Sequence, residues 1–177
     1  KRMFDETEFL SDYGIRSLSK YHKENPYRFV FDGGSVQVDY TPAESTGDMF
    51  GGNSNWRGPI WFPMNYLILD SLSKFSDYYG TDYEVEFPTN SGQMMNIKDA
   101  AAGVSQRLLA MFLPDKHGKI PMYGEYDKIQ KDPNFKENHL FFEYFDGDTG
   151  KGLGANHQTG WTGLISEIIR QLYGKQS

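Results

Sequence analysis

The stretch that decides the fold runs from residue 59 to residue 79 and reads PIWFPMNYLILDSLSKFSDYY. Its apolar residues recur at helical spacing, which predicts one amphipathic helix over the whole stretch. Pro59 suits the first helical turn, Pro63 is still tolerated there, and Gly80 is a natural C-terminal stop. The residues expected on or beside the buried face are Ile60, Trp61, Met64, Leu67, Ile68, Leu72, Phe75 and Tyr79.

Two more helices are predicted further along the chain. Asn96 is a suitable N-cap for a helix from residue 97 to residue 113, which Pro114 ends. Its expected inward residues are Ala101, Val104, Leu108, Leu109 and Phe112. A last helix is predicted from residue 159 to residue 173, before Gly174, with Leu164, Ile165, Ile168, Ile169 and Leu172 as its apolar residues. The chain is therefore expected to be mainly α-helical.

The remaining segments are predicted to be loops with little regular structure. The exception is a β-hairpin over residues 27–40, where apolar residues alternate on both sides of Gly33 and Gly34. The other assignments are a helix or irregular segment over 6–21, loop over 41–55, linker over 83–96, loop or short hairpin over 116–136, and an extended segment over 140–145. Loops of such length in a compact domain are usually functional.

Composition excludes several classes of function. The 177 residues carry a net charge of −6, which argues against a surface that follows nucleic-acid phosphates. The chain has no cysteine, so disulfides, cysteine-based zinc sites and cysteine nucleophiles are excluded. No apolar run approaches the roughly 20 residues of a membrane span, and the four histidines show no metal-binding spacing.

The segment with the most chemical information runs from residue 138 to residue 164, NHLFFEYFDGDTGKGLGANHQTGWTGL. It places one carboxylate, Glu143, between aromatic residues, followed by a glycine-rich loop and by His157, Gln158 and Trp161. Aromatics that partly dehydrate a carboxylate can make it a general base or acid. The alternatives are a salt-bridged glutamate on a strand and, for the aspartates of the loop, a turn or a calcium site; the loop lacks the oxygen ligands of an EF-hand.

A second cluster runs from residue 51 to residue 65 and reads GGNSNWRGPIWFPMN, with the motif NWRGPIW at residues 55–61. Trp56 or Trp61 can stack on a sugar ring, and the guanidinium of Arg57 can donate hydrogen bonds to hydroxyls. The alternative is that Trp61 belongs to the core and that Arg57 pairs with a nearby carboxylate. Spacing alone leaves both interpretations open.

Two long motifs resemble glycoside hydrolase family 63, in the C-terminal part of its catalytic domain. They are NWRGPIWFPMNYLI, residues 55–68, and FFEYFDGDTGKGLGANHQTGWTGL, residues 141–164. The shorter segments LSDYGIRSLS and VDYTPAES also resemble this family, so the likeness runs from about Leu10 to Tyr173. The family includes processing α-glucosidases, among them mannosyl-oligosaccharide glucosidases, and bacterial relatives that act on mannosylglycerate or glucosylglycerate.

The resemblance implies a fold and a mechanism. The fold is an (α/α)6 barrel, of which residues 1–177 would be a single C-terminal segment with a small β-hairpin and long loops. The reaction is inverting hydrolysis of α-glucosidic or related α-glycosidic bonds by two carboxylates, with Glu143 as general base. The residues implied in substrate binding are Trp56, Arg57, Gly58, Trp61, Tyr144, Gln158 and Trp161.

The same resemblance implies the partners. The substrate is an oligosaccharide or a small α-glycoside, and neither a metal ion nor an organic cofactor is required. The general acid of the family is an aspartate that lies before this region. We therefore expect the N-terminal remainder of the protein to supply the acid and the missing helices, and the segment alone to be inactive. The rival interpretations are a non-catalytic carbohydrate-binding remnant or subunit, a structural module whose aromatics are all core, and a phosphorylase or lyase on the same barrel.

Overall fold

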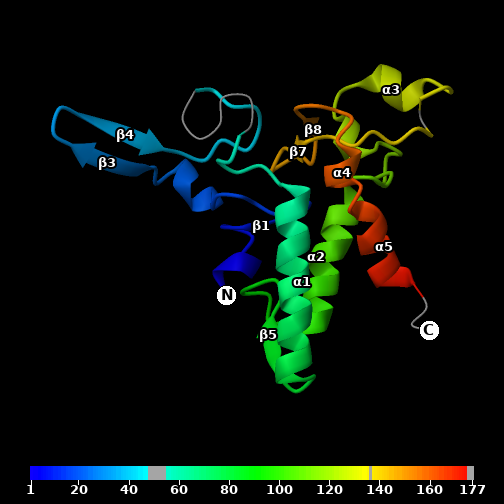
Figure 1. The fold of residues 1–177 in the computed structure, drawn as a ribbon, viewed down its shortest axis with the longest axis horizontal. Helices are drawn as coiled ribbons and strands as arrows, with labels where there is room; N and C mark the ends of the chain where they lie inside the picture. The colour runs from blue at the N-terminus through cyan, green and yellow to red at the C-terminus, as the bar shows by residue number, and fades with distance from the viewer. Residues whose placement is uncertain (48–54, 136, 175–177) are drawn as a thin grey trace.

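The structure is a computed structural model that describes residues 1–47, 55–135 and 137–174. Within these residues the fold combines helices with four two-stranded antiparallel sheets (Figure 1). The α-helices are α1 (Phe62–Tyr79), α2 (Ile97–Ala110), α3 (Asp127–Lys131), α4 (Thr159–Thr162) and α5 (Ile165–Tyr173). The paired strands are β1 (Leu10–Ser11) with β2 (Gly14–Ile15), β3 (Tyr27–Phe31) with β4 (Gly34–Val38), β5 (Glu84–Glu86) with β6 (Met94–Asn96), and β7 (Tyr144–Phe145) with β8 (Gly152–Leu153). Short 3-10 helices cover Arg2–Phe4, Lys20–Lys23 and Pro121–Tyr123.

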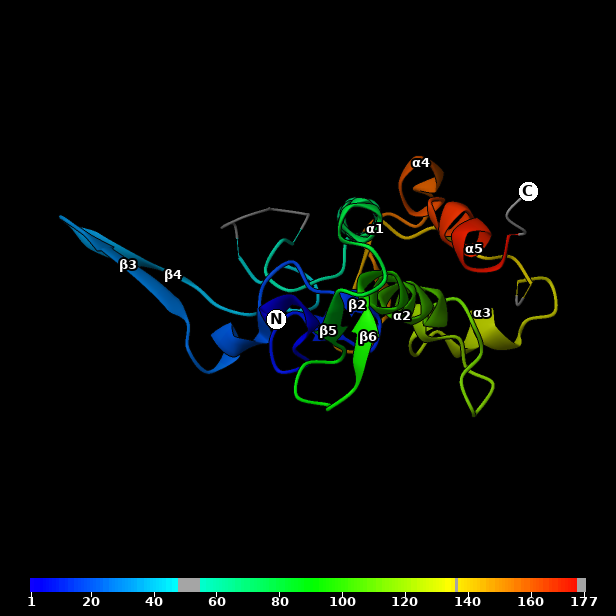
Figure 2. The same ribbon diagram turned by 90° about the horizontal axis from the view of Figure 1, so that it is seen from below.

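The core lies where α2 packs between α1 and α5 (Figures 1 and 2). Helix α1 contributes Phe62, Leu69 and Leu72 to it, while α2 contributes Val104 and Leu108. Buried side chains from the N-terminal segment and from β7 join the same cluster. The β7 region therefore rests directly on the helical core.

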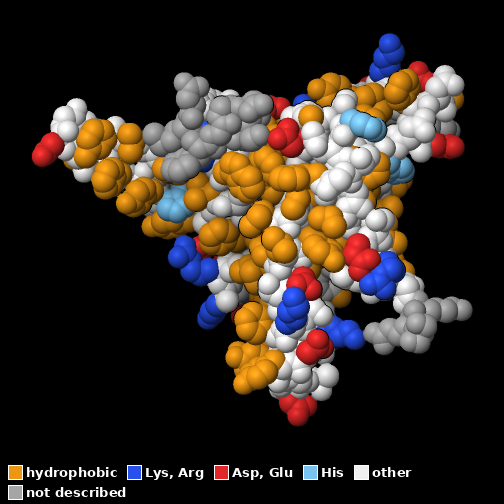
Figure 3. Space-filling model, viewed as in Figure 1, with side chains coloured by type: hydrophobic (Ala, Val, Ile, Leu, Met, Phe, Trp, Pro, Cys, Tyr) orange, Lys and Arg blue, Asp and Glu red, His pale blue; other side chains and the backbone are white. Residues whose placement is uncertain are grey.

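Helix α1 confirms the predicted element but only part of its predicted face. The helix begins at Phe62, because Pro59 and Ile60 are extended and Ile60 forms bridges to other segments. Its buried residues are Phe62, Asn65, Leu69 and Leu72, whereas Met64, Leu67, Phe75 and Tyr79 are exposed. The predicted face is therefore only partly confirmed: Ile60, Trp61 and Leu72 are buried as expected and Ile68 packs against the core. The other four residues are exposed because apolar residues stand on two sides of this helix, and the buried side carries an asparagine. Figure 3 shows the apolar side chains that remain on the surface.

The other two predicted helices are confirmed with different ends. Asn96 caps α2 as expected, since its side-chain oxygen accepts a hydrogen bond from the Asp99 amide at 2.9 Å. The helix ends at Ala110 instead of residue 113, and Ala100 is more deeply buried than the predicted Ala101. The last predicted helix is divided into α4 and α5 at Gly163, and Ile169 is exposed.

The loops contain more regular structure than the sequence predicts. The hairpin of β3 and β4 is confirmed, but it projects from the body of the fold and exposes most of its side chains (Figure 2). The predicted linker over residues 83–96 contains the hairpin of β5 and β6. The first segment, 6–21, is irregular and contains the small hairpin of β1 and β2. The hairpin of residues 27–40 is thus one of four strand pairs within the described residues, and the segment 116–136, expected as a loop or short hairpin, contains the 3-10 helix Pro121–Tyr123 and α3 instead of strands. None of the described helices is both long and apolar enough to cross a membrane.

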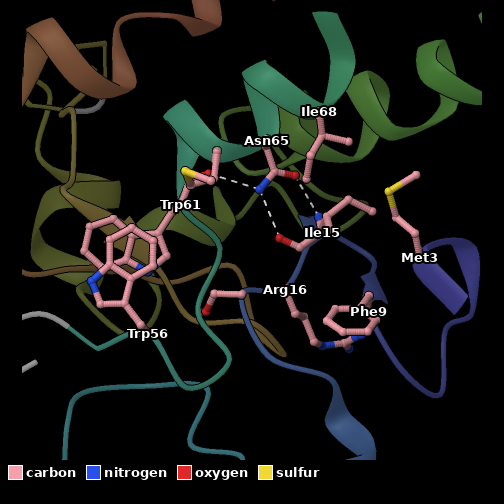
Figure 4. Close-up of a pocket in the computed structure, with 10 residues that line it drawn as sticks. Met3, Phe9, Ile15, Arg16, Trp56, Trp61, Asn65 and Ile68 are labelled. Atoms are coloured by element: carbon pink, nitrogen blue, oxygen red, sulfur yellow. Dashed lines mark hydrogen bonds between the residues drawn. The ribbon is translucent and has the colours of Figure 1, made fainter. Parts of the chain in front are cut away.

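One buried amide fixes the N-terminal segment to α1. Asn65 donates hydrogen bonds to the carbonyl oxygens of Ile15 and Trp61, each at 3.0 Å, and accepts one from the Ile15 amide at 2.8 Å (Figure 4). These bonds pair backbone groups that would be costly to bury without partners. The Asn65 side chain therefore links the start of α1, next to Trp61, to strand β2.

Candidate active site

The two predicted motifs meet through backbone pairing. The Ile60 amide donates to the Phe145 carbonyl at 2.8 Å, and the Phe145 amide donates to the Ile60 carbonyl at 3.0 Å. This antiparallel bridge places Trp61 next to Tyr144, and their rings stack with centroids 4.8 Å apart at 20°. Two segments that are far apart in the sequence therefore form one site, with Glu143 next to Tyr144.

Three tryptophans form an aromatic cluster at this site. Trp56 lies parallel to Trp61, with centroids 4.0 Å apart at 3°, and Trp161 meets Trp61 edge-on at 6.1 Å (Figure 4 shows the first pair). Trp61 is only 2% exposed, whereas Trp56 is 40% and Trp161 is 37% exposed. In this arrangement Trp61 is the buried centre of the cluster, and Trp56 and Trp161 leave ring surface exposed to solvent.

Glu143 is held at the edge of this cluster. Its backbone amide donates to the Ala155 carbonyl at 2.7 Å, and its side-chain Oε2 accepts from the Ala155 amide at 3.3 Å. Gly154 packs against it: a methyl group there would lie 2.7 Å from Glu143 Oε2, and its φ of +67° favours glycine. The glycine-rich loop thus packs closely against the Glu143 side chain.

Tyr144 interacts with two carboxylates, Glu44 and its neighbour Glu143. Its ring is fully buried, and its hydroxyl donates to Glu44 Oε2 at 2.7 Å. Burial raises the pKa of the phenol, and the hydrogen bond to Glu44 and the negative charges of Glu44 and Glu143 raise it further. Tyr144 is therefore a neutral hydrogen-bond donor throughout the physiological pH range.

The loop after β7 is shaped by its aspartates. Asp146 Oδ1 accepts the amides of Asp148 at 2.8 Å and Thr149 at 3.0 Å, which closes a turn. Asp148 instead reaches the N-terminal half, where its Oδ1 accepts from Tyr40 at 2.9 Å, Lys20 at 3.1 Å and Arg16 at 3.2 Å. A methyl group at the intervening Gly147 would lie 2.3 Å from the Gly58 carbonyl oxygen, so this loop packs directly on the tryptophan motif.

The Asp148 carboxylate should make stability depend on pH. Burial alone would raise its pKa, but the hydrogen bonds from Tyr40 and Lys20 and the charges of Lys20 and Arg16 outweigh burial and lower it. A carboxyl whose pKa falls on folding stabilises the protein above its unfolded value of about 3.9 and loses this contribution as pH falls through the lower folded value. We expect Asp148→Asn to lower the melting temperature at pH 7. The difference in melting temperature between this variant and the wild type should become smaller as the pH falls below about 4.

Melting curves from pH 7 to pH 3 measure this effect. Asp77→Asn, on the exposed side of α1, is the matched control and should leave the curve unchanged. A constant gap between Asp148→Asn and wild type at all pH values would contradict the prediction.

Arg57 and Gly58 are tied into the scaffold. Arg57 is buried and donates to Asp39 Oδ1 at 3.1 Å, forming an ion pair, and to Ser45 Oγ at 3.4 Å. The Gly58 amide donates to Ser17 Oγ at 3.1 Å. The sequence left two interpretations of Arg57 open, hydrogen bonding to sugar hydroxyls and pairing with a nearby carboxylate. The structure shows the pairing, with Asp39.

Gln158 and His157 lie at the entrance of α4. The Gln158 amide donates to the Phe141 carbonyl at 2.8 Å, and its carbonyl accepts from the Thr162 amide at 2.9 Å. The Gln158 side chain is half-buried and His157 is exposed. This backbone pairing brings α4, and with it Trp161, to the segment that carries Glu143, directly before β7.

Two residues of the site were missed in the sequence. Asn55 is fully buried, and its amide donates to the carbonyls of Thr41 at 2.6 Å and Ala43 at 2.7 Å, while its oxygen accepts the Arg57 amide at 3.0 Å. It thereby brings the segment before the undescribed residues 48–54 to the cluster, and Glu44 with it. The one available signal was that VDYTPAES, which contains Glu44, resembles the family.

A cavity of about 370 Å³ adjoins the cluster on the side of α1 (Figure 4). Trp56, Trp61, Arg16 and Asn65 line it together with apolar side chains, and Glu143 does not. Among the described residues there is no group of three or more histidines and carboxylates that could hold a metal ion.

Comparison with known proteins gives consistent matches. The family model described as "Mannosylglycerate hydrolase MGH1-like glycoside hydrolase domain" matches residues 1–162. The chain is 51% identical over 95% of its length to an uncharacterized protein of Saccharomyces cerevisiae. It is 29% identical over 98% of its length to a probable mannosyl-oligosaccharide glucosidase of Schizosaccharomyces pombe, and 28% identical over 94% to the mannosyl-oligosaccharide glucosidase of S. cerevisiae. The chain spans only 14–16% of the length of these relatives.

Proposed function

Because this chain belongs to the mannosylglycerate hydrolase MGH1-like glycoside hydrolase family, we propose that it forms part of the catalytic domain of an inverting α-glycosidase. Membership confirms the resemblance to glycoside hydrolase family 63 that the two motifs predict. The substrate would be an oligosaccharide or small α-glycoside, in line with the relatives that are named mannosyl-oligosaccharide glucosidase.

The observation that carries the proposal is the bridge between Ile60 and Phe145. It brings a half-buried carboxylate, Glu143, to an aromatic cluster with two exposed indoles. Flat apolar faces beside hydrogen-bonding groups suit a sugar ring, and a carboxylate partly withdrawn from water suits acid–base chemistry. The same residues on separate surfaces would support neither role.

In the proposed mechanism, Glu143 takes a proton from a water molecule that attacks the anomeric carbon. Trp56 and Trp161 hold the sugar, Trp61 and Tyr144 support them, and Arg57, Gly58 and Gln158 shape the walls of the site. The transition state resembles an oxocarbenium ion, which an anionic, aromatic-walled site stabilises. An acid about 6.5–9.5 Å from the base must protonate the leaving oxygen, and we assign it to another part of the same (α/α)6 barrel. The segment alone is then inactive.

The first test is the hydrolysis of a panel of α-glucosides and α-mannosides by the full-length protein. Proton NMR identifies the anomer that forms before mutarotation. We expect the β-anomer to appear first, because inversion at an α-linked carbon gives that configuration. Release of the α-anomer first would indicate a retaining enzyme.

The second candidate function is carbohydrate binding without catalysis. The exposed indoles of Trp56 and Trp161 serve binding as well as hydrolysis. Absence of hydrolysis on the whole panel, with tryptophan fluorescence still changed by sugar, would favour this candidate. A purely structural role predicts no fluorescence change with any sugar.

A further inference from the structure

We propose that Glu44 is a positioning residue for the reaction, because it accepts the hydrogen bond of the Tyr144 hydroxyl and so keeps that hydroxyl from donating to Glu143. This inference rests on the proposed function of Glu143 as general base. It concerns a carboxylate to which the predicted mechanism gives no role.

The contacts of Glu44 point to a single role. Its Oε2 accepts from the Tyr144 hydroxyl at 2.7 Å, and Tyr144 is its only hydrogen-bond partner within the described part of the chain. The segment that carries it is anchored by Asn55, which binds the carbonyl of the preceding residue, Ala43, at 2.7 Å. Ala43 also packs against the cluster of Trp61 and Tyr144. The exposed Glu44 carboxylate is thus oriented by its hydrogen bond with the Tyr144 hydroxyl.

The Glu143 carboxylate lies close to the ring edge of Tyr144, the residue whose hydroxyl binds Glu44. Gly154 touches both side chains, since a methyl group there would be 2.7 Å from Glu143 Oε2 and 2.9 Å from Tyr144 Cε1. The charge of Glu143 also contributes to the raised pKa of the phenol. Two carboxylates therefore act on a phenol that has one proton to donate.

The choice between these two acceptors matters for catalysis. A hydrogen bond donated to a carboxylate stabilises its charged form and makes it a weaker base. With Glu44 in place, the Tyr144 hydroxyl donates its proton in a hydrogen bond to Glu44 Oε2 at 2.7 Å. Without Glu44, the hydroxyl is free to rotate toward Glu143, and proton abstraction from water becomes harder.

The test is a double-mutant cycle in the full-length protein. Glu44→Ala is expected to lower kcat roughly tenfold, a fraction of the 10²–10⁴ that a general base contributes, with KM little changed. In the Tyr144→Phe background, which lacks the hydroxyl, Glu44→Ala should have no further effect on kcat. Glu44→Gln keeps an acceptor oxygen and should retain most of the wild-type kcat. Asp77→Ala is the control for loss of an exposed carboxylate.

An undiminished effect of Glu44→Ala in the Tyr144→Phe background would overturn the proposal, as would a wild-type kcat in Glu44→Ala. A rise in KM alone would instead show that Glu44 contacts the sugar directly, and would also overturn it. The carbon-13 NMR resonance of the Tyr144 ζ-carbon, identified by its loss in Tyr144→Phe, gives a readout that needs no turnover. It should shift in Glu44→Ala and stay unchanged in the control Asp77→Ala. A wild-type protein without hydrolytic activity would defeat the proposed function, and the resonance would still report whether the pair exists.

Discussion

Glu143→Gln is expected to lower kcat of the full-length protein by roughly 10²–10⁴-fold, the usual contribution of a positioned general base. Glutamine has nearly the same shape, and its side-chain oxygen can still accept the Ala155 amide, now 3.3 Å from Oε2. It cannot take a proton from water at neutral pH. The aromatic cluster is unchanged, so sugar binding followed by tryptophan fluorescence should keep its wild-type affinity.

The matched control is Glu84→Gln, which changes an exposed glutamate on β5, in a hairpin separate from the site. It should leave both kcat and sugar affinity unchanged. Turnover that survives in Glu143→Gln would move the base to another residue. Loss of binding together with turnover would mean that Glu143 holds the sugar and would weaken its assignment as base.

The chemistry of this site was easier to predict from sequence than its geometry. Glu143 among aromatics and the NWRGPIW motif stand out because each is a short, local pattern. Their contact depends on the Ile60–Phe145 bridge, which joins two extended segments that have no alternating pattern to pair them. Only the resemblance to a known family suggested that these motifs belong to one site.

The fold shows the same division between local and long-range information. The cap at Asn96 and the hairpin of β3 and β4 depend on neighbouring residues and were predicted correctly. The buried face of α1 depends on where α2 packs, and the apolar residues on both its sides gave no means to choose. Asn65 was missed for the same reason, because its partner Ile15 lies 50 residues away.

Replacing the two stacked tryptophans one at a time should have different effects on stability and on substrate binding. Trp61→Ala is expected to destabilise the region by about 3–5 kcal/mol, the usual cost of removing a large aromatic side chain from a core. The indole is 2% exposed, stacks on Trp56 and Tyr144, and donates to the Asn55 carbonyl at 2.9 Å. Hydrogen exchange should then accelerate in peptides that cover residues 56–68 and 141–153, because local opening becomes less costly.

Trp56→Ala is the matched variant, since the same ring type is removed from the exposed side of the stack. Its ring is 40% exposed, so the loss of stability should be about 1 kcal/mol, mostly from the stacking itself. If Trp56 is the surface that holds the sugar, KM should rise roughly tenfold, which corresponds to about 1.4 kcal/mol of binding. Fast exchange with unchanged KM in Trp56→Ala would assign both rings to the core and leave Trp161 as the exposed aromatic surface. The pair of variants thus distinguishes the indole that supports the site from the indole that faces the substrate.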